Sequence, residues 1–344
     1  MTTAACTNLV SFQRPVALAP RRRAVATAPM RVSFAGGGTD LPPFLPGIGG
    51  RVVGTAIDLR VRAEVEPFDR GWVRLELSAT GQELTRRNTD APASDIAFRL
   101  LEAALADIGV QEGVRVRVET SVVPGAGLGG SGAAAVALLA ALWTSILDLP
   151  TADTLARDAL RIEREGLRLA CGLQDPLFAA HGGMLDLRFD EHGEVTPREL
   201  TGCAEMRTSF AAGLLLIDTG RRRVSGEVLG RVRTEPEVTA ELVAAAEDVA
   251  RGFEEGSLEQ VLAGMRRSAS AKLRRDPEGN QPAIALAERL ASRGAEVVRM
   301  CGAGEGGHIL VWAKPDRHAQ IAAELGHMVR TPGLDAPGVQ LEED

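Results

Sequence analysis

The first third of the chain spaces its apolar residues as β-strands do. Uninterrupted apolar runs at 31–35 and 52–57 predict buried strands, and alternating patterns at 61–66 and 72–77 predict half-exposed ones. Valines at every second position of 114–118 predict a further strand, and Ser94 is a suitable N-terminal cap for a helix that reaches residue 108. This part of the chain is therefore expected to be rich in β-structure.

An uncharged stretch at 122–147 is long enough to be compared with a membrane span. Proline and several glycines interrupt its first part, so the remaining apolar helix, 133–147, is short for a bilayer and is expected to lie in a protein core. Thr151 is predicted to cap the next helix, which carries Glu163 on its later turns, and 184–189 is predicted to be a strand.

The second half predicts a strand, three helices and two more strands around a glycine loop. The strands are expected at 213–218, 295–300 and 308–312, and the helices at 236–255, 257–274 and 281–293. Strands and helices that do not alternate strictly indicate an α+β fold. The polar stretch 190–208, which contains Gly and Pro, is expected to separate two domains, 29–205 and 206–344.

Composition narrows the class of protein. A chain of 344 residues, 45% hydrophobic and 25% charged, fits a globular protein of two domains. Its net charge of -7 gives no general attraction to nucleic acid or to an anionic membrane, so neither is expected as a partner. The four cysteines are widely spaced, which indicates neither a zinc site nor a disulfide framework and suits the cytoplasm. Residues 1–28 are expected to form a disordered extension, with a transit peptide as the alternative.

A glycine-rich segment lies between the strand at 114–118 and the buried helix. Its backbone N–H groups and the positive end of the helix would converge on one point, which is the arrangement of a phosphate-binding loop. Glycine is needed there because a side chain would keep phosphate oxygens away from the backbone. The candidate nucleotide-binding residues are Pro124, Gly125, Gly127, Leu128, Gly129, Gly130, Ser131 and Gly132.

Two other interpretations of this loop stay open on its residues alone. Positions 125–130 also read Gly-x-Gly-x-x-Gly, a weak dinucleotide fingerprint, but the elements that follow lack the strand and the acid that a Rossmann unit needs. The other interpretation is a flexible turn that leads into a core helix. No Walker A motif is present, because no Lys-Ser or Lys-Thr pair closes the glycine run.

Three ordered motifs resemble those of the GHMP superfamily of small-molecule kinases. They are the loop at 124–134, the segment Ala-Pro-Met-Arg-Val-Ser-Phe-Ala-Gly-Gly-Gly-Thr-Asp at 28–40, and Gly-Ala-Gly-Glu-Gly-Gly at 302–307. The Gly-Gly-Gly-Thr-Asp sequence, together with Gly-Leu-Gln-Asp-Pro at 172–176, looks most like the heptose 7-phosphate kinase branch. The resemblance implies an α+β GHMP kinase fold, with a β-rich N-terminal domain like that of a ribosomal protein and a ferredoxin-like C-terminal domain.

The resemblance also implies phosphoryl transfer from ATP with Mg²⁺. Ser131 and Glu163 match positions that hold Mg²⁺ in the family, the alternative for Glu163 being a solvated helix charge. Asp175 matches the acid that takes the proton of the attacking hydroxyl; its alternative role is to cap a helix before Pro176. Arg31 matches a basic residue near the transferred phosphate, where it would stabilise the transition state and lower the pKa of Asp175.

The implied acceptor is a heptose 7-phosphate, or a longer sugar phosphate such as an octose 8-phosphate, phosphorylated at the anomeric hydroxyl on the way to a nucleotide-activated sugar in secondary metabolism. A monomer or homodimer is expected. Residues matched to the sugar and to the glycine loop beside it are Gly38, Thr39, Asp40, Gln174, Gly302, Ala303 and Gly304. Arg223 and Lys272 are candidates for binding the phosphate of the acceptor, with exposed surface charge as the alternative.

Four positions depart from the family pattern. Gly130 and Gly132 replace serines, Glu305 replaces a glycine, and His308 replaces an apolar residue. Loss of two hydroxyls is expected to weaken phosphate contacts, and a carboxylate near the transferred charge is expected to repel it or to select an unusual acceptor. The rival hypothesis is a catalytically silent sugar- or nucleotide-binding protein that kept the fold.

Overall fold

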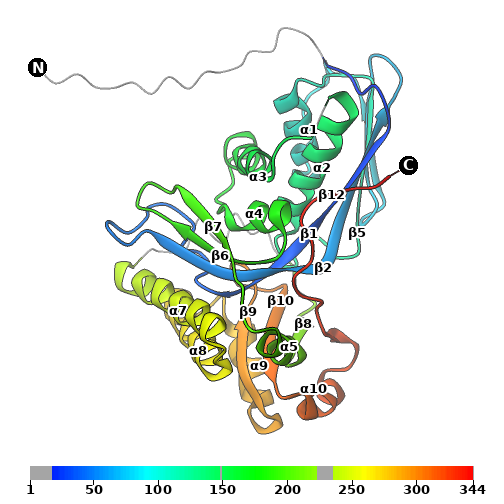
Figure 1. Ribbon diagram of the computed structural model, residues 1–344. Helices are drawn as coiled ribbons and strands as arrows, with labels where there is room; N and C mark the ends of the chain where they lie inside the picture. Colours follow the sequence, from blue (N-terminus) through cyan, green and yellow to red (C-terminus); the bar gives the residue numbers. More distant parts are fainter. Residues whose placement is uncertain (1–17, 148, 223–234, 344) are drawn as a thin grey trace, which may run out of the picture.

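The computed structural model describes residues 18–147, 149–222 and 235–343. Within this part of the chain, an eight-stranded and a four-stranded β-sheet are covered by helices (Figure 1). Strands and helices are mixed without strict alternation, as expected for an α+β fold. None of the described helices is long and apolar enough to cross a membrane.

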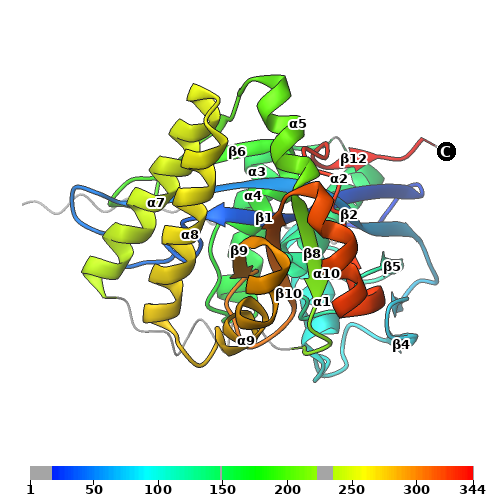
Figure 2. The same cartoon turned by 90° about the horizontal axis from the view of Figure 1, so that it is seen from below.

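Strands β1 (Ala24–Ala35) and β2 (Gly50–Pro67) form the antiparallel pair at the centre of the larger sheet. All of β1 except Thr27 is buried, because helices of the first half and of the second half pack on it from opposite sides (Figures 1 and 2). The strands predicted at 52–57 and 61–66 are one strand, since pairing with β1 continues between them. Residues 24–28, expected in the N-terminal extension, belong to this sheet.

The remaining strands of the larger sheet extend β2 in two directions. The first half of β2 pairs with β6 (Met184–Phe189), and its second half pairs with β5 (Val114–Thr120). Beyond β5 lie β3 (Val73–Leu77) and β4 (Gln82–Arg86), and beyond β6 lies β7 (Val195–Glu199). β4 and β7 were not predicted, because both are largely exposed and lack an apolar pattern.

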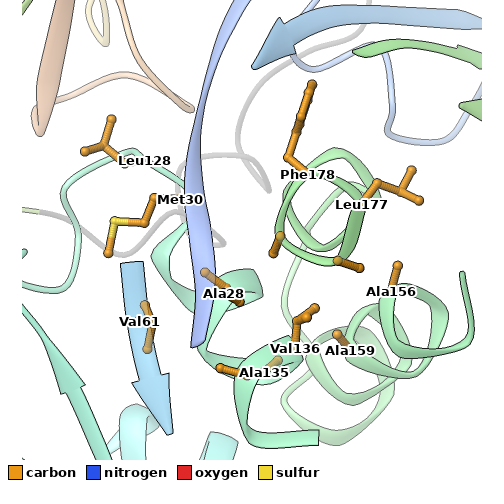
Figure 3. Close-up of a cluster of buried hydrophobic side chains, with 14 of the residues drawn as sticks. Ala28, Met30, Val61, Leu128, Ala135, Val136, Ala156, Ala159, Leu177 and Phe178 are labelled. Carbon is orange, nitrogen blue, oxygen red and sulfur yellow. The ribbon is translucent and has the colours of Figure 1, made fainter. Parts of the chain in front are cut away.

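Four helices cover one face of this sheet. They are α1 (Ile96–Ile108), α2 (Gly130–Ile146), α3 (Ala152–Arg161) and α4 (Gln174–His181). The predicted cap Thr151 is confirmed, whereas the cap of α1 is Asp95 rather than Ser94, because the Asp95 carboxylate accepts the N–H of Ala97 at 2.8 Å. Figure 3 shows Val136 of α2 beside the small residue Ala159 of α3, where the two helices approach closely in the core.

The second half builds the smaller sheet and its helices. The sheet contains β11 (Val329–Arg330), β8 (Leu214–Asp218), β10 (His308–Ala313) and β9 (Ala295–Met300), in this order. Its helices are α5 (Ala204–Ala212), α7 (Pro236–Glu255), α8 (Leu258–Arg275), α9 (Gln281–Leu290) and α10 (His318–Leu325). Helices α7 and α8 form an antiparallel pair beside the sheet (Figure 2). The predicted elements of this half are therefore present.

The two halves share one hydrophobic core. The rings of Phe34, Phe210 and Phe253, from β1, α5 and α7, lie within 4.9 to 5.9 Å of one another, centroid to centroid. The end of the chain also returns to the first half, because β12 (Gln340–Leu341) pairs with β1. The expected division at 205/206 therefore separates two sheets but cuts through the main core, and a smaller second cluster lies within the second half.

Candidate active site

A cleft of about 590 Å³ runs between the glycine loop, the start of α4, the end of α8 and the loop after β9. Its polar part is lined by predicted site residues from both halves of the chain. These are Arg31, Gly38, Asp40, Pro124, Gly125, Gly127, Gly129, Gly130, Ser131, Glu163, Gln174, Asp175, Gly302 and Ala303. The structure thus brings into one cavity most of the residues that the three motifs singled out.

The glycine loop leads into α2 with an open helix end. Gly125, Gly127 and Gly129 have φ angles of +85°, +76° and +75°, a left-handed conformation that other residues adopt only with strain. No side chain caps the N-terminus of α2, so the positive end of the helix and its first N–H groups are left for a ligand. This geometry suits an anionic group such as a phosphate.

Ser131 and Glu163 meet beside this helix end. The Ser131 hydroxyl donates to the Glu163 carboxylate at 2.5 Å, and Glu163 is 2% exposed. Glu163 lies in a single π-helical turn, Ile162–Gly166, which follows α3. Burial, with the nearby charge of Asp175, raises the pKa of Glu163 to about 7, although the Ser131 hydrogen bond opposes the rise.

This oxygen pair fits Mg²⁺. The described residues place no Lys or Arg side chain in a salt bridge with Glu163, so a cation would meet a buried carboxylate that lacks an ionic partner. No group of three or more metal-ligating His, Cys, Asp or Glu side chains exists in the described chain, so the protein offers few ligands of its own. Mg²⁺ commonly takes one or two protein oxygens and completes its shell with phosphate and water.

Asp175 and Arg31 form the second polar contact of the cleft. The Arg31 guanidinium reaches one Asp175 oxygen through Nε at 2.8 Å and Nη2 at 2.6 Å, and its Nη1 donates to the carbonyl of Gly127 at 2.8 Å. Arg31 therefore ties the carboxylate to the glycine loop. Asp175 lies in the first turn of α4, and Leu173 is the residue at the N-cap position. Asp175 therefore does not cap the helix, as the alternative interpretation had it.

Asp40 is a buried carboxylate at the other side of Asp175. It accepts hydrogen bonds from the N–H of Gly38 at 3.2 Å and from the backbone and side-chain amides of Gln174 at 3.2 and 2.9 Å. Burial and the charge of Asp175 raise the pKa of Asp40. Gly172 must be glycine here, since a Cβ would lie 1.7 Å from an Asp40 oxygen.

Thr39 is placed differently from the expectation. Its hydroxyl donates to the carbonyls of Gly36 and Arg51 and accepts from the N–H of Arg51, all at 2.8 to 2.9 Å, and it is 2% exposed. Thr39 therefore fixes the loop that presents Asp40 and does not line the cleft. The expectation that Thr39 contacts the sugar is therefore corrected, because all hydrogen bonds of its hydroxyl are made inside the protein.

The last glycine loop, 302–307, packs on the glycine loop that precedes α2. Gly307 has a φ of +85°, and a Cβ there would lie 2.4 Å from the carbonyl of Ala126. The backbone N–H of His308 donates to the same carbonyl at 2.9 Å, and the His308 ring nitrogen Nδ1 lies 2.9 Å from it. Burial lowers the pKa of His308, which favours the neutral ring. Gly302 and Ala303 line the cleft from this loop, whereas Gly304 packs on the carbonyl of Gly279.

Part of the chain that forms this site is similar to proteins of known family. Residues 95–183 match the family model of the GHMP kinases N terminal domain. This segment, which contains the glycine loop, α2 and Asp175, is therefore similar to the N-terminal domain of GHMP kinases. A D-glycero-alpha-D-manno-heptose 7-phosphate kinase of Campylobacter jejuni is 23% identical over 314 residues, which cover 86% of this chain and 91% of the relative.

Solved structures show the same fold over nearly the whole chain. A D-glycero-D-manno-heptose 1-phosphate kinase of Bacteroides thetaiotaomicron has a TM-score of 0.74 at 19% identity, covering 93% of this chain and 99% of its own. Galactokinase of Lactococcus lactis in complex with galactose has a TM-score of 0.72 at 14% identity, covering 93% and 95%. The predicted GHMP kinase fold is confirmed.

The glycines that depart from the GHMP pattern have different surroundings. A Cβ on Gly132 would lie 3.0 Å from the Cβ of Asp175 and 3.1 Å from the backbone nitrogen of Pro176. A Cβ on Gly130 would meet nothing closer than the end of Met30, at 3.5 Å. Glycine at 132 therefore lets α2 approach α4 at the position of Asp175. No comparably close contact requires glycine at 130.

Of the two predicted phosphate-binding cations, the structure describes only Lys272, which does not line the cleft. Lys272 is 3% exposed and its ammonium donates to the carbonyls of Met300 and Gly302, so it supports the last glycine loop from behind. This corrects its expected role, because a buried ammonium held by backbone oxygens does not reach the cavity. Arg223 lies outside the described residues.

Other parts of the cleft were not predicted from the sequence. Two arginines, Arg222 and Arg275, line it although neither belongs to a family motif. Its far end is apolar and is formed by residues on β3, α1, β5 and the segment after β5, including Leu77, Ile96, Leu100, Val118 and Val122. These residues had been assigned to strands and helices only, and nothing in their pattern distinguishes a cavity wall from a core.

Proposed function

We propose that this protein is an ATP-dependent sugar kinase that phosphorylates the anomeric hydroxyl of a heptose 7-phosphate or of a related higher-sugar phosphate such as an octose 8-phosphate. The match to the GHMP kinases N terminal domain and the similarity to a heptose 7-phosphate kinase support kinase activity on a sugar. The observation that carries the proposal is the contact of Asp175 with Arg31 next to an uncapped, glycine-rich helix end. An acid, a fixed cation and a phosphate site are the parts that phosphoryl transfer needs.

The nucleotide would lie along the glycine loop. The triphosphate is held by the backbone of the loop and by the positive end of α2, and the base enters the apolar end of the cleft beside Leu77 and Val118. Ser131 and Glu163 would hold Mg²⁺, which neutralises charge on the phosphates. Because Glu163 has a raised pKa, it must lose its proton to serve as a metal ligand.

Asp175 acts as the general base in this proposal. It accepts the proton of the anomeric hydroxyl as the hydroxyl oxygen bonds to the γ-phosphorus and the bond to the leaving ADP oxygen breaks. The permanent charge of Arg31, 2.6 to 2.8 Å from the Asp175 oxygen, favours the ionised carboxylate and lies where negative charge develops.

Asp40 would select the sugar. A carboxylate has about four acceptor positions, and in Asp40 three hydrogen bonds from Gly38 and Gln174 already use most of them. The remaining capacity faces the cleft, where it can accept a hydroxyl of the acceptor. A ligand held by a pre-positioned carboxylate is discriminated well from one that lacks the hydroxyl.

The direct test is to follow ADP formation with ATP, Mg²⁺ and a panel of heptose 7-phosphates and octose 8-phosphates. The substitution Asp175→Ala provides the background rate. Phosphorus NMR of the product locates the new phosphate, which should couple to the anomeric proton. If no sugar phosphate gives ADP above the Asp175→Ala background, the proposed acceptor class is wrong; ATP binding by calorimetry without turnover on a broad sugar panel would favour the silent binding protein instead.

A further inference from the structure

Three arginines line the cleft, and they differ in what their guanidinium groups contact. Arg31 binds Asp175, and Arg222 makes a two-point salt bridge with Asp218 at 2.7 Å on each side. Arg275 forms no salt bridge within 4 Å to any carboxylate of the described chain. Among the described arginines that line the cleft, Arg275 is therefore the one without a carboxylate partner.

The guanidinium of Arg275 is largely enclosed but weakly bonded. Its Nη2 lies 3.3 Å from the carbonyl of Gly37, a long hydrogen bond, and its buried Nε has no hydrogen-bond partner. Gly38 lies against the planar group, since a Cβ there would be 2.5 Å from both Nη atoms. A buried donor without a partner costs free energy, so this position is unfavourable unless something else binds there.

Arg275 is held on a firm frame. It is the last residue of α8, which is anchored through the Lys272 ammonium to the carbonyl of Gly302. The Asn280 amide then binds the carbonyls of Lys272 and Asp276 at 3.3 and 2.7 Å, which fixes the turn after the helix. The guanidinium is therefore positioned in advance, as a specific binding group should be.

The contacts of Arg275 lie at the acceptor end of the cleft. Gly37 and Gly38, which lie against its guanidinium, belong to the loop that presents Asp40, and the charge of Asp40 acts on Arg275. None of its hydrogen bonds reaches the glycine loop or the Ser131–Glu163 pair. An anion on Arg275 would therefore be carried by the acceptor and not by the nucleotide.

We propose that Arg275 binds the phosphate that the acceptor already carries, and so selects phosphorylated sugars over free ones. A guanidinium donates two parallel hydrogen bonds to a phosphate monoester, which matches a planar group whose nitrogens lack strong partners. The proposal rests on the proposed function, because it names the part of the acceptor that this site recognises. It gives Arg275 the role that was expected of Lys272.

The test compares three variants: Arg275→Met, Arg275→Lys and, as a matched control, Arg274→Met. Arg274 is the neighbouring residue, half exposed and paired with Glu241 away from the cleft. Kinetics with a heptose 7-phosphate and with the same heptose lacking the phosphate are measured for each protein, along with the KM for ATP. Thermal unfolding of each variant shows that it is folded.

Arg275→Met is expected to lower kcat/KM for the sugar phosphate by about 10- to 100-fold, the usual range for loss of hydrogen bonds to a charged group. Activity on the unphosphorylated sugar and the KM for ATP should stay near wild type, and Arg275→Lys should lie between. Arg274→Met should resemble wild type. An equal loss on both sugars, or a raised KM for ATP with an unchanged KM for the sugar phosphate, would overturn the assignment.

A second measurement separates this proposal from the proposed reaction. Heptose 7-phosphate should raise the melting temperature of the wild-type protein more than the free heptose does, and Arg275→Met should abolish the difference. If the wild type makes no ADP but shows this difference, the reaction is wrong and the phosphate site stands. If the wild type shows no difference between the two sugars, the phosphate site is wrong.

Discussion

Asp175 interacts with residues from several parts of the candidate site. Arg31 binds its carboxylate, its Cβ lies against Gly132 of α2, and its charge acts on both Glu163 and Asp40. Three carboxylates thus share one cleft, and of the three only Asp175 forms a salt bridge with an arginine of the described cleft. Burial raises the pKa of both Glu163 and Asp40, and the negative charge of Asp175 raises it further.

Replacing Asp175 with Asn should isolate its chemical role. Asn keeps the size of the side chain but cannot take up the proton of the acceptor, so kcat is expected to fall by about 10²- to 10⁴-fold while the KM for ATP changes little. Steady-state kinetics measure both. Asp153→Asn is the control, since that exposed acid contacts His181 on the far side of α4, and wild-type kcat in Asp175→Asn would exclude it as the base.

The raised pKa of Glu163 predicts how stability depends on pH in the absence of metal. Between its ordinary value of 4.5 and about 7, the folded protein keeps a proton on Glu163 that the unfolded chain has released. The free energy of unfolding should therefore decrease as pH rises through this window, since the folded state binds more protons there. Above about pH 7 both states are ionised and the dependence on Glu163 ends.

Denaturant unfolding with a chelator at several pH values checks this sign. Glu163→Gln stays neutral throughout, so the difference in unfolding free energy between wild type and this variant should shift against the wild type as pH rises from about 4.5 to about 7. Asp40, whose pKa is also raised, contributes to both proteins and cancels in the comparison. A difference that is constant over the window would mean that Glu163 titrates normally.

At the scale of elements, the site is assembled where helix ends meet loops of glycine. The start of α2, the start of α4 and the end of α8 all point at the cleft, and the two glycine loops lie against each other through Gly307 and Ala126. Close approach of backbone to backbone explains the glycines better than flexibility does. Helix positions near the cleft are constrained by the same contacts.

The pair Gly130 and Gly132 tests this explanation. Gly132→Ser should force α2 away from Asp175 and Pro176, which lie 3.0 and 3.1 Å from the added Cβ, and overpacking of this kind costs about 1–3 kcal/mol. Gly130→Ser, with 3.5 Å to Met30, should leave stability close to wild type. Thermal unfolding and kinetics of the two variants give the comparison, and equal effects would contradict it.

Elements with strong periodicity could be predicted from the sequence, and pairing partners could not. The helices at 236–255 and 257–274 were predicted within a residue or two because their apolar spacing is regular and Ser257 caps the second. The edge strand β4 was missed because hydrogen bonds to β3, rather than apolar side chains, define it. Local patterns carry no record of such long-range pairing.

The candidate site shows the same limit. Asp175, Glu163 and the glycine loop were identified because they lie in motifs, and the structure brings them together. Lys272 was misjudged because charge alone does not reveal whether an ammonium faces a cavity or backbone carbonyls. Arg275, three residues further along α8, was missed for the same reason, since only the fold shows which of the two enters the cleft.

At the scale of the whole molecule, one core joins the two sheets. The aromatic group of Phe34, Phe210 and Phe253 connects β1 with α5 and α7, and the chain end returns to β1 through β12. The cleft therefore has walls from both halves that are fixed to each other by buried apolar contacts. Movement of one half against the other would break this core, so its walls are expected to keep their spacing.

A shared core predicts a single cooperative unfolding transition. Trp312 lies in the second half, where its indole N–H donates to the carbonyl of Phe210 at 3.0 Å, and Trp72 and Trp143 lie in the first. In Trp312→Phe, and separately in a protein with both Trp72→Phe and Trp143→Phe, the fluorescence midpoint should coincide with the far-ultraviolet circular dichroism midpoint.

Phe210→Ala should destabilise the protein by about 3–5 kcal/mol and shift the midpoints of both probes together, because the cavity it leaves belongs to both halves. Separate midpoints for the two reporters would show that the halves unfold independently and that the aromatic group does not couple them.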